Sequence, residues 1–514
     1  MIKKRLPTIF LGIFFALLVL FISNIDFSGK DVFDTIFKEI NGVLATFLFY
    51  DVSFGMVKGA SLPFIVVWLI VAGVFFTFRF NFVNLRMLPH SLKVLMGKYK
   101  TKDDKGEVSS FASLTAALSA TVGLGNIAGV AIAVSIGGPG ATFWMIVAGF
   151  LGMTLKFTEV TLSQQYRVWR PDGKIMGGAM EYLSRGLKEK GMPVFGKVLA
   201  IVFAIFTIGG SLGAGNAFQV GQSMGAMAEV VPFIKEYPIV YGLIMATLVG
   251  FVIIGGIKRI ANTAEAVVPT MVVIYLSATV FILLSNFDKI PHAFSLIFTG
   301  AFHPVAVAGG VIGVLVQGFK RAVFSSEAGI GSAAIVHATA SVKYPVRQGF
   351  VALYEPFIDT IVICTMTALV IVITGVYDAH GEFANLVASK NGAALTSAAF
   401  GTVLSWFPII LTISVTLFAF STMISWSYYG ERAWTYVFGE RYTLVYRLLF
   451  IGFTVVASIV SLGSILEFSD LLILGMALPN LIGVYILHGH VKRDLTEYLK
   501  KLKSGELDRE VIKS

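Results

Sequence analysis

One apolar segment of this chain is interrupted by glycines and an asparagine at the depth where a membrane-spanning helix is usually most apolar. The segment 109–136 is long enough to cross a bilayer, and Gly123, Gly125, Asn126 and Gly129 lie in it. A helix break at this depth frees backbone N–H and C=O groups, which are tolerated only inside protein or against a polar cavity. Such a glycine-rich break predicts the solute site of a secondary transporter.

The composition places the rest of the chain in a membrane as well. Of the 514 residues, 56% are hydrophobic and 14% are charged, whereas soluble domains carry roughly 25% charged residues. The net charge of +10 does not indicate nucleic-acid binding, because the lysines and arginines lie in loops between apolar runs. The single cysteine, Cys364, excludes an intrachain disulfide and a cysteine-cluster metal site. We expect it to be a small buried side chain.

Apolar runs of about 20 residues predict an all-α polytopic membrane protein with about twelve spans. The first run follows a basic N-terminus and has no small-residue cleavage site after it, which favours an uncleaved anchor helix over a signal peptide. The spans are expected near 7–23, 61–80, 109–136, 140–163, 195–221, 238–256, 264–286, 306–338, 352–376, 403–428, 444–463 and 466–489.

Basic residues are concentrated in alternate loops of this arrangement. If the N-terminus is cytoplasmic, the basic segments 86–105, 167–190 and 492–514 all fall inside, and the outside segments hold only isolated lysines. Because cytoplasmic loops carry an excess of lysine and arginine, the sequence predicts a multi-pass protein of the plasma (inner) membrane. Both termini are expected in the cytoplasm.

Two blocks of five spans, 109–286 and 306–489, each have an interrupted first span. An odd number of spans gives the two blocks opposite orientations. In the second block the interruption lies within 316–332, where two adjacent basic residues and Glu327 are costly in lipid unless they face an interior or a cytoplasmic vestibule. Paired interruptions in inverted repeats are typical of alternating-access carriers.

The remaining segments flank these two repeats. The segment 1–60 is expected to hold an N-terminal anchor helix and an outer amphipathic segment. A preceding transmembrane helix and a basic cytoplasmic loop are expected in 61–108. The segment 490–514 is expected to be a cytoplasmic tail.

The chemistry of a zwitterionic amino acid suggests which side chains bind it. Its carboxylate needs donors, which the N-termini of half-helices supply, and its ammonium needs acceptors such as freed carbonyls and side-chain amides. Asn126 offers such an amide, and the alternative is an interhelical hydrogen bond without ligand contact. Gln219, in the span 195–221, is open to the same two interpretations.

Hydroxyls in the span 403–428 form a candidate cation site. Ser421, Thr422 and Ser425 offer the oxygen ligands that Na+ prefers, and the alternative is hydrogen bonding to carbonyls of their own helix. Glu327 opens a glycine-rich stretch, where it either fixes the break by accepting backbone N–H groups or pairs with a cation.

Most of the other intramembrane charges are expected near span ends. Interfacial pairing or snorkelling explains charges at such positions. These residues are Lys156, Glu159, Glu265, Glu355, Asp359, Glu467 and Asp470.

Several long motifs resemble the alanine or glycine:cation symporter family. They follow one another in order over about 60–490 and lie at 120–130, 137–141, 143–145, 152–159, 213–219, 325–333 and 426–432. The family has the fold of the LeuT-like amino-acid carriers. The resemblance therefore implies a five-plus-five inverted repeat with a broken first helix in each repeat, one preceding helix at 61–80 and, in this chain, the extra N-terminal span.

The resemblance also implies Na+-coupled symport of small neutral amino acids, chiefly alanine and glycine. The substrate-binding residues that it implies are Thr121, Gly123, Gly125, Asn126, Gln219, Phe319 and Trp426. The coupling ion Na+ is expected near Ala120, Gly123, Ser421 and Thr422. Structural or gating roles are expected for Glu327, Gly329 and Gly331.

Other functions remain open at this point. Many members of the family have threonine where this chain has Leu124, so one hydroxyl near the pocket is missing. The nearest alternative is an H+-coupled amino-acid carrier, with Glu327 as the carboxylate to suspect. A channel would need a continuous polar stripe, and an enzyme would need a catalytic motif that the sequence lacks. The expected partners are an amino acid and the lipid bilayer, without nucleic acid or organic cofactor; the oligomeric state stays open.

Overall fold

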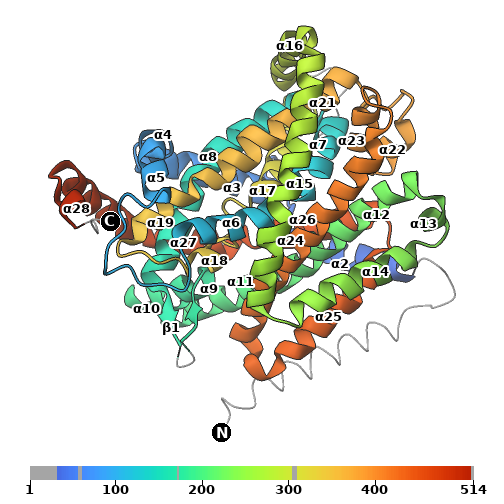
Figure 1. Ribbon diagram of the computed structural model, residues 1–514. Coiled ribbons are helices and arrows are strands. Elements are labelled where there is room, and N and C mark those ends of the chain that lie inside the picture. Colours follow the sequence, from blue (N-terminus) through green and yellow to red (C-terminus); the bar gives the residue numbers. More distant parts are fainter. Residues whose placement is uncertain (1–31, 56–60, 171–172, 304–308, 511–514) are drawn as a thin grey trace.

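The computed structural model describes residues 32–55, 61–170, 173–303 and 309–510. Figure 1 shows these residues as a bundle of long helices. Within the described residues the one sheet is a short hairpin, in which β1 (Val168–Trp169) pairs antiparallel with β2 (Ile175–Met176). The all-α class is therefore confirmed, and the expected anchor helix 7–23 lies outside the described residues.

Helices long and apolar enough to cross a membrane make this a multi-pass membrane protein. Six such helices are Gly140–Tyr166, Pro193–Val230, Asn262–Ser285, Pro345–Thr374, Phe407–Phe438 and Leu462–Lys503. A bent pair, Ser110–Thr121 with Gly125–Gly137, makes a seventh candidate if its two halves, which meet at 53°, are counted as one span. Phe64–Arg79 and Pro238–Ile253 are apolar but shorter. The expected count of about twelve and the five-plus-five symmetry stay predictions.

Local sequence explains where many helices begin. Proline occupies the first helical positions of α11 (Pro193–Leu212), α14 (Pro238–Ile253) and α19 (Pro345–Ala352), where its missing N–H group costs nothing. Ser109 caps α6 (Ser110–Thr121), because its Oγ accepts a hydrogen bond from the backbone N–H of Ala112 over 3.0 Å.

The other helices complete the bundle. At its edge α2 packs against α26, and the Asn41 side chain donates a hydrogen bond to the Ser464 carbonyl over 3.3 Å. The α-helices include α2 (Val32–Leu48), α3 (Phe64–Arg79), α4 (Val83–Arg86), α5 (Leu88–Leu95), α7 (Val130–Gly137), α8 (Gly140–Tyr166), α9 (Ala179–Glu181), α10 (Leu187–Glu189), α12 (Phe218–Val230), α13 (Pro232–Glu236), α15 (Ile257–Ser285), α16 (Ile290–Phe302), α17 (Gly310–Ser326), α18 (Ala334–His337), α20 (Tyr354–Pro356), α21 (Thr365–Thr374), α22 (Ala384–Ala388), α23 (Gly392–Gly401), α24 (Phe407–Phe438), α25 (Thr443–Ala457), α26 (Leu462–Gly475), α27 (Ala477–Lys503) and α28 (Glu506–Arg509).

Helix α8 is a central element of the packing, because it contacts α3, α17 and α19. Its small residues allow close approach: a Cβ on Gly152 would lie 2.7 Å from the Ala328 Cβ. On α3, a Cβ on Gly73 would lie 2.9 Å from the Leu151 Cβ. Small residues that let backbones approach are the usual means of helix association in membranes.

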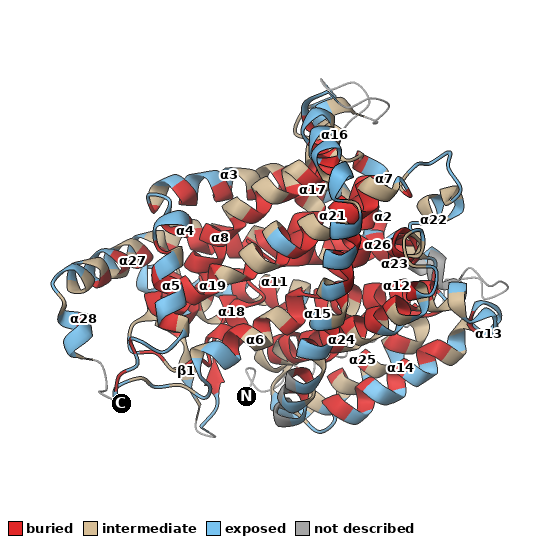
Figure 2. Ribbon diagram, turned by 45° about the horizontal axis from the view of Figure 1, so that its top comes forward, coloured by how far each residue is buried: buried red, intermediate tan, exposed pale blue. Residues whose placement is uncertain are grey.

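Buried and exposed residues separate clearly between the inside and outside of the bundle. Figure 2 shows mostly buried residues along α17 and α26 and exposed ones on α28 and α13. Large apolar side chains such as Phe251, Val273 and Phe298 are exposed on the outer helices α14, α15 and α16. In a membrane these side chains face lipid, so the polar residues of the interior are the ones to examine for function.

Candidate functional site

The helix break within 109–136 lies where the sequence predicts it. α6 ends at Thr121, and Val122 has φ −75° and ψ 86°, outside helical geometry. The chain then forms a π-helical turn, η1 (Gly125–Gly129), before α7 begins. Single π-helical turns occur often at functional sites. The break therefore exposes peptide groups of residues 122–125 in the interior of the protein.

Two side-chain amides take up these freed peptide groups. The Gly123 N–H donates to Asn126 Oδ1 over 2.9 Å, and the Leu124 N–H donates to Gln219 Oε1 over 3.3 Å. Gln219 Nε2 in turn donates to the Ala214 carbonyl over 2.9 Å. Both predicted site residues thus lie at the break, and in this conformation both hold its geometry through protein hydrogen bonds.

The carboxylate of Asp359 connects the first break to α17. Asn126 Nδ2 donates to Asp359 Oδ1 over 2.6 Å, and the Ser325 hydroxyl donates to Asp359 Oδ2 over 2.8 Å. A Cβ on Gly125 would lie 3.0 Å from the Ser325 Cα, so the two segments are almost in backbone contact. We expected Asp359 near a span end and did not assign it to the site, although an ionisable residue within a membrane span is a functional candidate by default.

The second break also lies in the predicted glycine-rich stretch. α17 ends at Ser326, and Glu327, Gly329 and Gly331 have positive φ angles of 57°, 87° and 78°. The Glu327 carboxylate accepts a hydrogen bond from the Ser332 hydroxyl five residues later. This bond closes the loop on itself before α18 begins. Glu327 is therefore bonded to a hydroxyl in this conformation.

Asn480 holds the same loop from the opposite side. Its Nδ2 donates to the Gly329 carbonyl over 2.9 Å and to Glu159 Oε1 over 2.5 Å. A Cβ on Gly331 would lie 2.8 Å from Asn480 Oδ1. Glycine at this position is thus required both by its positive φ angle and by the close approach of α27.

The predicted sodium ligands come together between α6 and α24. A Cβ on Gly123 would lie 2.2 Å from Thr422 Oγ1, and that hydroxyl is buried without a hydrogen-bond partner. The Ser421 hydroxyl lies 2.9 Å from the Ser119 hydroxyl, which also contacts Ser425 Oγ over 2.8 Å. An unpartnered buried oxygen beside a helix break fits a hard cation that takes oxygen ligands. Ala120 is buried on the same turn of α6 as Ser119.

Among the described residues, no cluster of three or more His, Cys, Asp and Glu side chains could hold a metal ion. The groups present at this position are the Thr422 hydroxyl and the backbone beside Gly123, so a cation there would be held by hydroxyl and carbonyl oxygens. Such a ligand set suits an alkali ion better than a transition metal.

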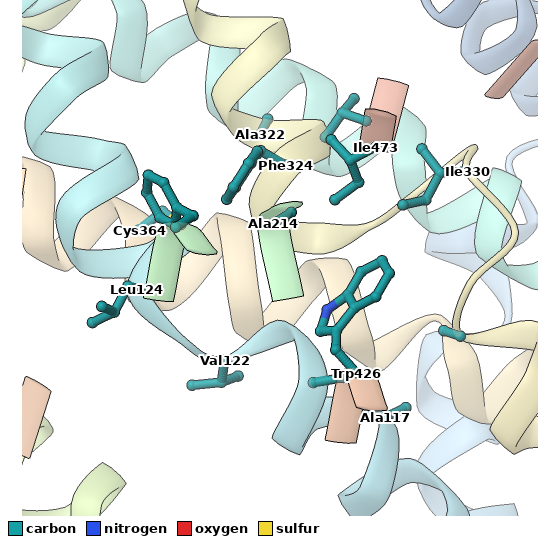
Figure 3. Packing of buried hydrophobic residues seen from close by; sticks show 14 of the residues in the cluster. Ala117, Val122, Leu124, Ala214, Ala322, Phe324, Ile330, Cys364, Trp426 and Ile473 are labelled. Atoms are coloured by element: carbon teal, nitrogen blue, oxygen red, sulfur yellow. The ribbon is translucent and has the colours of Figure 1, made fainter. Parts of the chain in front are cut away.

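The remaining predicted substrate residues are buried near the two breaks. Trp426 is packed against η3 (Gly213–Ala217), because a Cβ on Gly215 would lie 2.4 Å from the Trp426 Cβ. Figure 3 shows the Trp426 indole among buried side chains that include Val122 and Phe324. Phe319 is buried on α17, and the Thr121 hydroxyl donates to the Ala117 carbonyl of its own helix over 3.3 Å.

Several charges that we expected near span ends lie in the interior. Lys156 Nζ pairs with Glu355 Oε2 over 3.0 Å, and both side chains are fully buried. Glu355 Oε1 also contacts His337 Nε2 on α18, beyond the second break. Of the two expected explanations, pairing and snorkelling, snorkelling is therefore wrong for Lys156 and Glu355, which are paired. A buried charge of this kind needs an ionic partner, and the sequence spacing does not reveal which residue it is.

The adjacent basic residues of α17 face the interior, as one of the two expected alternatives requires. Arg321 and Lys320 both pair with Asp470 on α26. The distance from Lys320 Nζ to Asp470 Oδ2 is 3.2 Å. Lys320 Nζ also lies 4.4 Å from the centroid of the Phe49 ring. These contacts join the helix of the second break to α26.

Comparison with known protein families gives a match over most of the chain. The family described as the sodium:alanine symporter family matches residues 49–513 of this chain. This range includes both breaks and every predicted site residue.

Individual relatives are similar over most of their length. The sodium/alanine symporter AgcS of Methanococcus maripaludis is 38% identical, over 86% of this chain and 96% of that protein. The probable sodium/glutamine symporter GlnT of Bacillus subtilis is 33% identical, over 86% of this chain and 89% of that protein. Among solved structures, MhsT in complex with L-phenylalanine covers 75% of this chain and 99% of its own, at 14% identity and a TM-score of 0.48.

Proposed function

The chain belongs to the sodium:alanine symporter family, and from this premise we propose that it carries small neutral amino acids, alanine and glycine first, into the cell together with Na+. It is a transport protein of the membrane and not an enzyme. The observation that carries the proposal is the broken helix of the first repeat, whose freed peptide groups lie beside the unpartnered hydroxyl of Thr422.

The substrate carboxylate would bind at the peptide N–H groups of the first break. The Leu124 N–H is now held by Gln219 Oε1 at 3.3 Å, which is long for a hydrogen bond of this type. A carboxylate would form a stronger, charge-assisted bond to the same donor. Gln219 Oε1 would then be free to accept from the substrate ammonium, in agreement with the role that the family resemblance implies for it.

Sodium would bind where Thr422 Oγ1 approaches Gly123. The hydroxyl of Ser421 and carbonyls near Ala120 and Gly123 would complete its oxygen ligands. An ion at this position holds α6 against α24 and stabilises the closed break. The ion and the substrate thus favour the same conformation, which couples their transport.

The walls of the site favour a small substrate side chain. Leu124 is fully buried, and Trp426 and Phe324 are almost fully buried. These large side chains lie on different elements around the break (Figure 3). Alanine and glycine add little volume to such a packed interior, where larger side chains would force a rearrangement.

Alternating access would follow from rearrangement of the two broken helices. Gly125 at the first break and Ser325 near the second break are almost in contact, so the two breaks lie next to each other. We place the basic loop before α6 and the C-terminal tail 490–514 in the cytoplasm, because of the excess of lysine and arginine in these segments. The five-span repeats at 109–286 and 306–489 are part of the same proposal.

Uptake by purified protein in liposomes tests the proposal. Radiolabelled alanine should accumulate when an inward Na+ gradient is imposed, and the accumulation should disappear when K+ replaces Na+ on both sides. Unlabelled internal alanine should accelerate entry by exchange, as expected of a carrier and not of a channel. Alanine entry that ignores the presence and direction of the Na+ gradient would refute the proposal.

The alternative is coupling to protons, and uptake into the same liposomes tests it. The buried carboxylate of Glu327 at the second break is the observation that favours it. A relative named putative sodium/proton-dependent alanine carrier YrbD, from Bacillus subtilis, is 37% identical over 70% of this chain. If a pH gradient drives alanine uptake without Na+, and a protonophore abolishes it, the coupling ion is the proton.

A further inference from the structure

A cavity of about 250 Å³ lies between the end of α3, helix α4 and the C-terminal part of α27. Figure 2 shows α4 and α27 together at one end of the bundle. Four basic residues line this basic cavity: Arg86, Lys492, Lys500 and Lys503. Lys492 is half-buried and the other three are exposed. Among the described residues, no acidic side chain lines the cavity, so it concentrates positive charge.

Helix α27 contributes one face to the basic cavity. Its lining residues lie at positions 492, 495, 496, 499, 500 and 503, which is the spacing of neighbours on one side of a helix. Lysines occupy both ends of this face, and Leu495 and Leu499 lie between them. Like charges at this spacing destabilise a helix, so an anion in the cavity would offset their repulsion.

The cations keep most of their donors free. Lys492 Nζ donates to the Arg79 carbonyl at the end of α3 over 3.2 Å, and Arg86 Nη1 donates to the Asn81 carbonyl over 3.3 Å. A guanidinium has five N–H donors and an ammonium has three. Within the part of the chain that the structure describes, none of the four basic side chains pairs with a carboxylate.

The acidic residues of the same C-terminal segment do not neutralise the basic cavity. Asp494 Oδ2 accepts a hydrogen bond from Gln165 Nε2 on α8 over 2.5 Å. Glu506 Oε1 pairs with Lys501 Nζ over 3.0 Å. Glu497 is exposed and does not line the cavity. The cavity therefore keeps its positive charge and remains open to an anion.

The surface beside the basic cavity is apolar. Phe78, Phe82 and Leu85 are all exposed, and the Phe78 and Phe82 rings meet edge to face with centroids 5.2 Å apart. Phe80 and Asn81, which line the cavity, lie between these two phenylalanines in the chain. Exposed apolar patches with a polar rim mark surfaces that contact membranes or other ligands. The matching ligand thus has both a negative charge and an apolar part.

We propose that the basic cavity binds the headgroup of an anionic phospholipid. Arg86 and the lysines of α27 would hold its phosphate, and its acyl chains would lie against Phe82 and Leu85. Clusters of basic residues next to the membrane attract anionic lipids, and a free phosphate would leave the apolar surface uncovered. The cytoplasmic location of this site rests on the proposed function, whereas the binding itself does not.

Native mass spectrometry of the purified protein in a neutral detergent tests the binding. Phosphatidylglycerol is titrated into one sample, and phosphatidylcholine, which has no net charge, is titrated into another. Each basic residue near an anionic lipid contributes about fivefold to affinity. We therefore expect one phosphatidylglycerol molecule to bind at least about tenfold more tightly than phosphatidylcholine. Equal affinity for the two lipids would overturn the proposal.

Two double variants with the same loss of charge locate the site. Lys500→Gln with Lys503→Gln removes two charges from the basic cavity and should weaken phosphatidylglycerol binding about tenfold or more. Lys93→Gln with Arg493→Gln removes two exposed charges that do not line the cavity and should leave binding within about twofold. Equal weakening in the two double variants would indicate diffuse attraction and would contradict a site at this cavity.

Thermal unfolding gives a second readout that does not depend on transport. A ligand that binds the folded protein stabilises it, so phosphatidylglycerol should raise the unfolding temperature of the wild type and of the control variant. The Lys500→Gln, Lys503→Gln variant should show a much smaller rise. Glycerol phosphate, which has the charged group without acyl chains, should not displace the lipid at equal concentration. Displacement by glycerol phosphate would assign the cavity to a soluble anion and would refute the lipid site.

Discussion

The Thr422 hydroxyl is the single atom on which the sodium site depends most. It is buried without a partner beside Gly123, so a cation would satisfy it. Thr422→Val keeps the shape of the side chain and removes this oxygen. We expect the Na+ concentration for half-maximal uptake to rise about tenfold or more, because a contact to a charge contributes about 1.5–3 kcal/mol.

The same helix provides a matched control for this substitution. Thr412 also has a buried hydroxyl without a partner, and it lies on α24 ten residues before Thr422. Thr412→Val should therefore leave the Na+ dependence of uptake unchanged. Equal effects of the two substitutions would remove Thr422 from the sodium site.

Asn126 has a structural role, which is one of the two interpretations that its position in the sequence left open. Its amide bonds both the Gly123 N–H and the Asp359 carboxylate. Asn126→Ala leaves the Gly123 N–H and Asp359 Oδ1 buried without these partners, at about 1–3 kcal/mol each, while Asp359 Oδ2 keeps its bond from Ser325. We expect this variant to lose alanine uptake and to unfold at a lower temperature in a detergent thermal-shift assay. A variant with wild-type unfolding temperature would show that the break is held by other contacts.

At the scale of elements, buried ion pairs join helices that are far apart in sequence. Lys156 on α8 and Glu355 on α20 pair in a fully buried position. Removing one partner, in Lys156→Met or Glu355→Gln, should destabilise the protein by about 3–5 kcal/mol. The double variant should unfold at a higher temperature than either single variant, because neither charge is then left alone. A double variant as unstable as the sum of the two would argue against direct pairing.

The more exposed ion pair between Lys343 and Glu510 is the control for this experiment. Lys343 and Glu510 are bonded over 3.1 Å, with side chains 31% and 21% exposed. Surface pairs contribute about 0–1 kcal/mol. Lys343→Ala should thus change the unfolding temperature much less than Lys156→Met does.

The two helix breaks illustrate what the sequence of an element can predict. Glycines at 123, 125, 329 and 331 located both interruptions, because backbone that leaves helical geometry in a membrane needs small residues and polar neighbours. The partners of each break were not predictable, since Asp359 and Asn480 come from other elements and spacing along the chain carries no signal of such contacts. For the same reason the sequence could not predict that Lys156 and Glu355 pair with each other.

At the scale of the whole molecule, the basic loops predict which side of the membrane each end of the protein faces. This orientation is easy to measure because the chain has a single cysteine. The single cysteine, Cys364, is buried, so the wild-type protein should not react with a membrane-impermeant maleimide. Lys289 and Lys500 are both exposed. In the proposed topology Lys289 lies outside the cell and Lys500 lies in the cytoplasm. In intact cells Lys289→Cys should be labelled and Lys500→Cys should be protected until the membrane is permeabilised. Labelling of Lys500→Cys in intact cells would place the C-terminal helix outside and would reverse the proposed orientation of the whole protein.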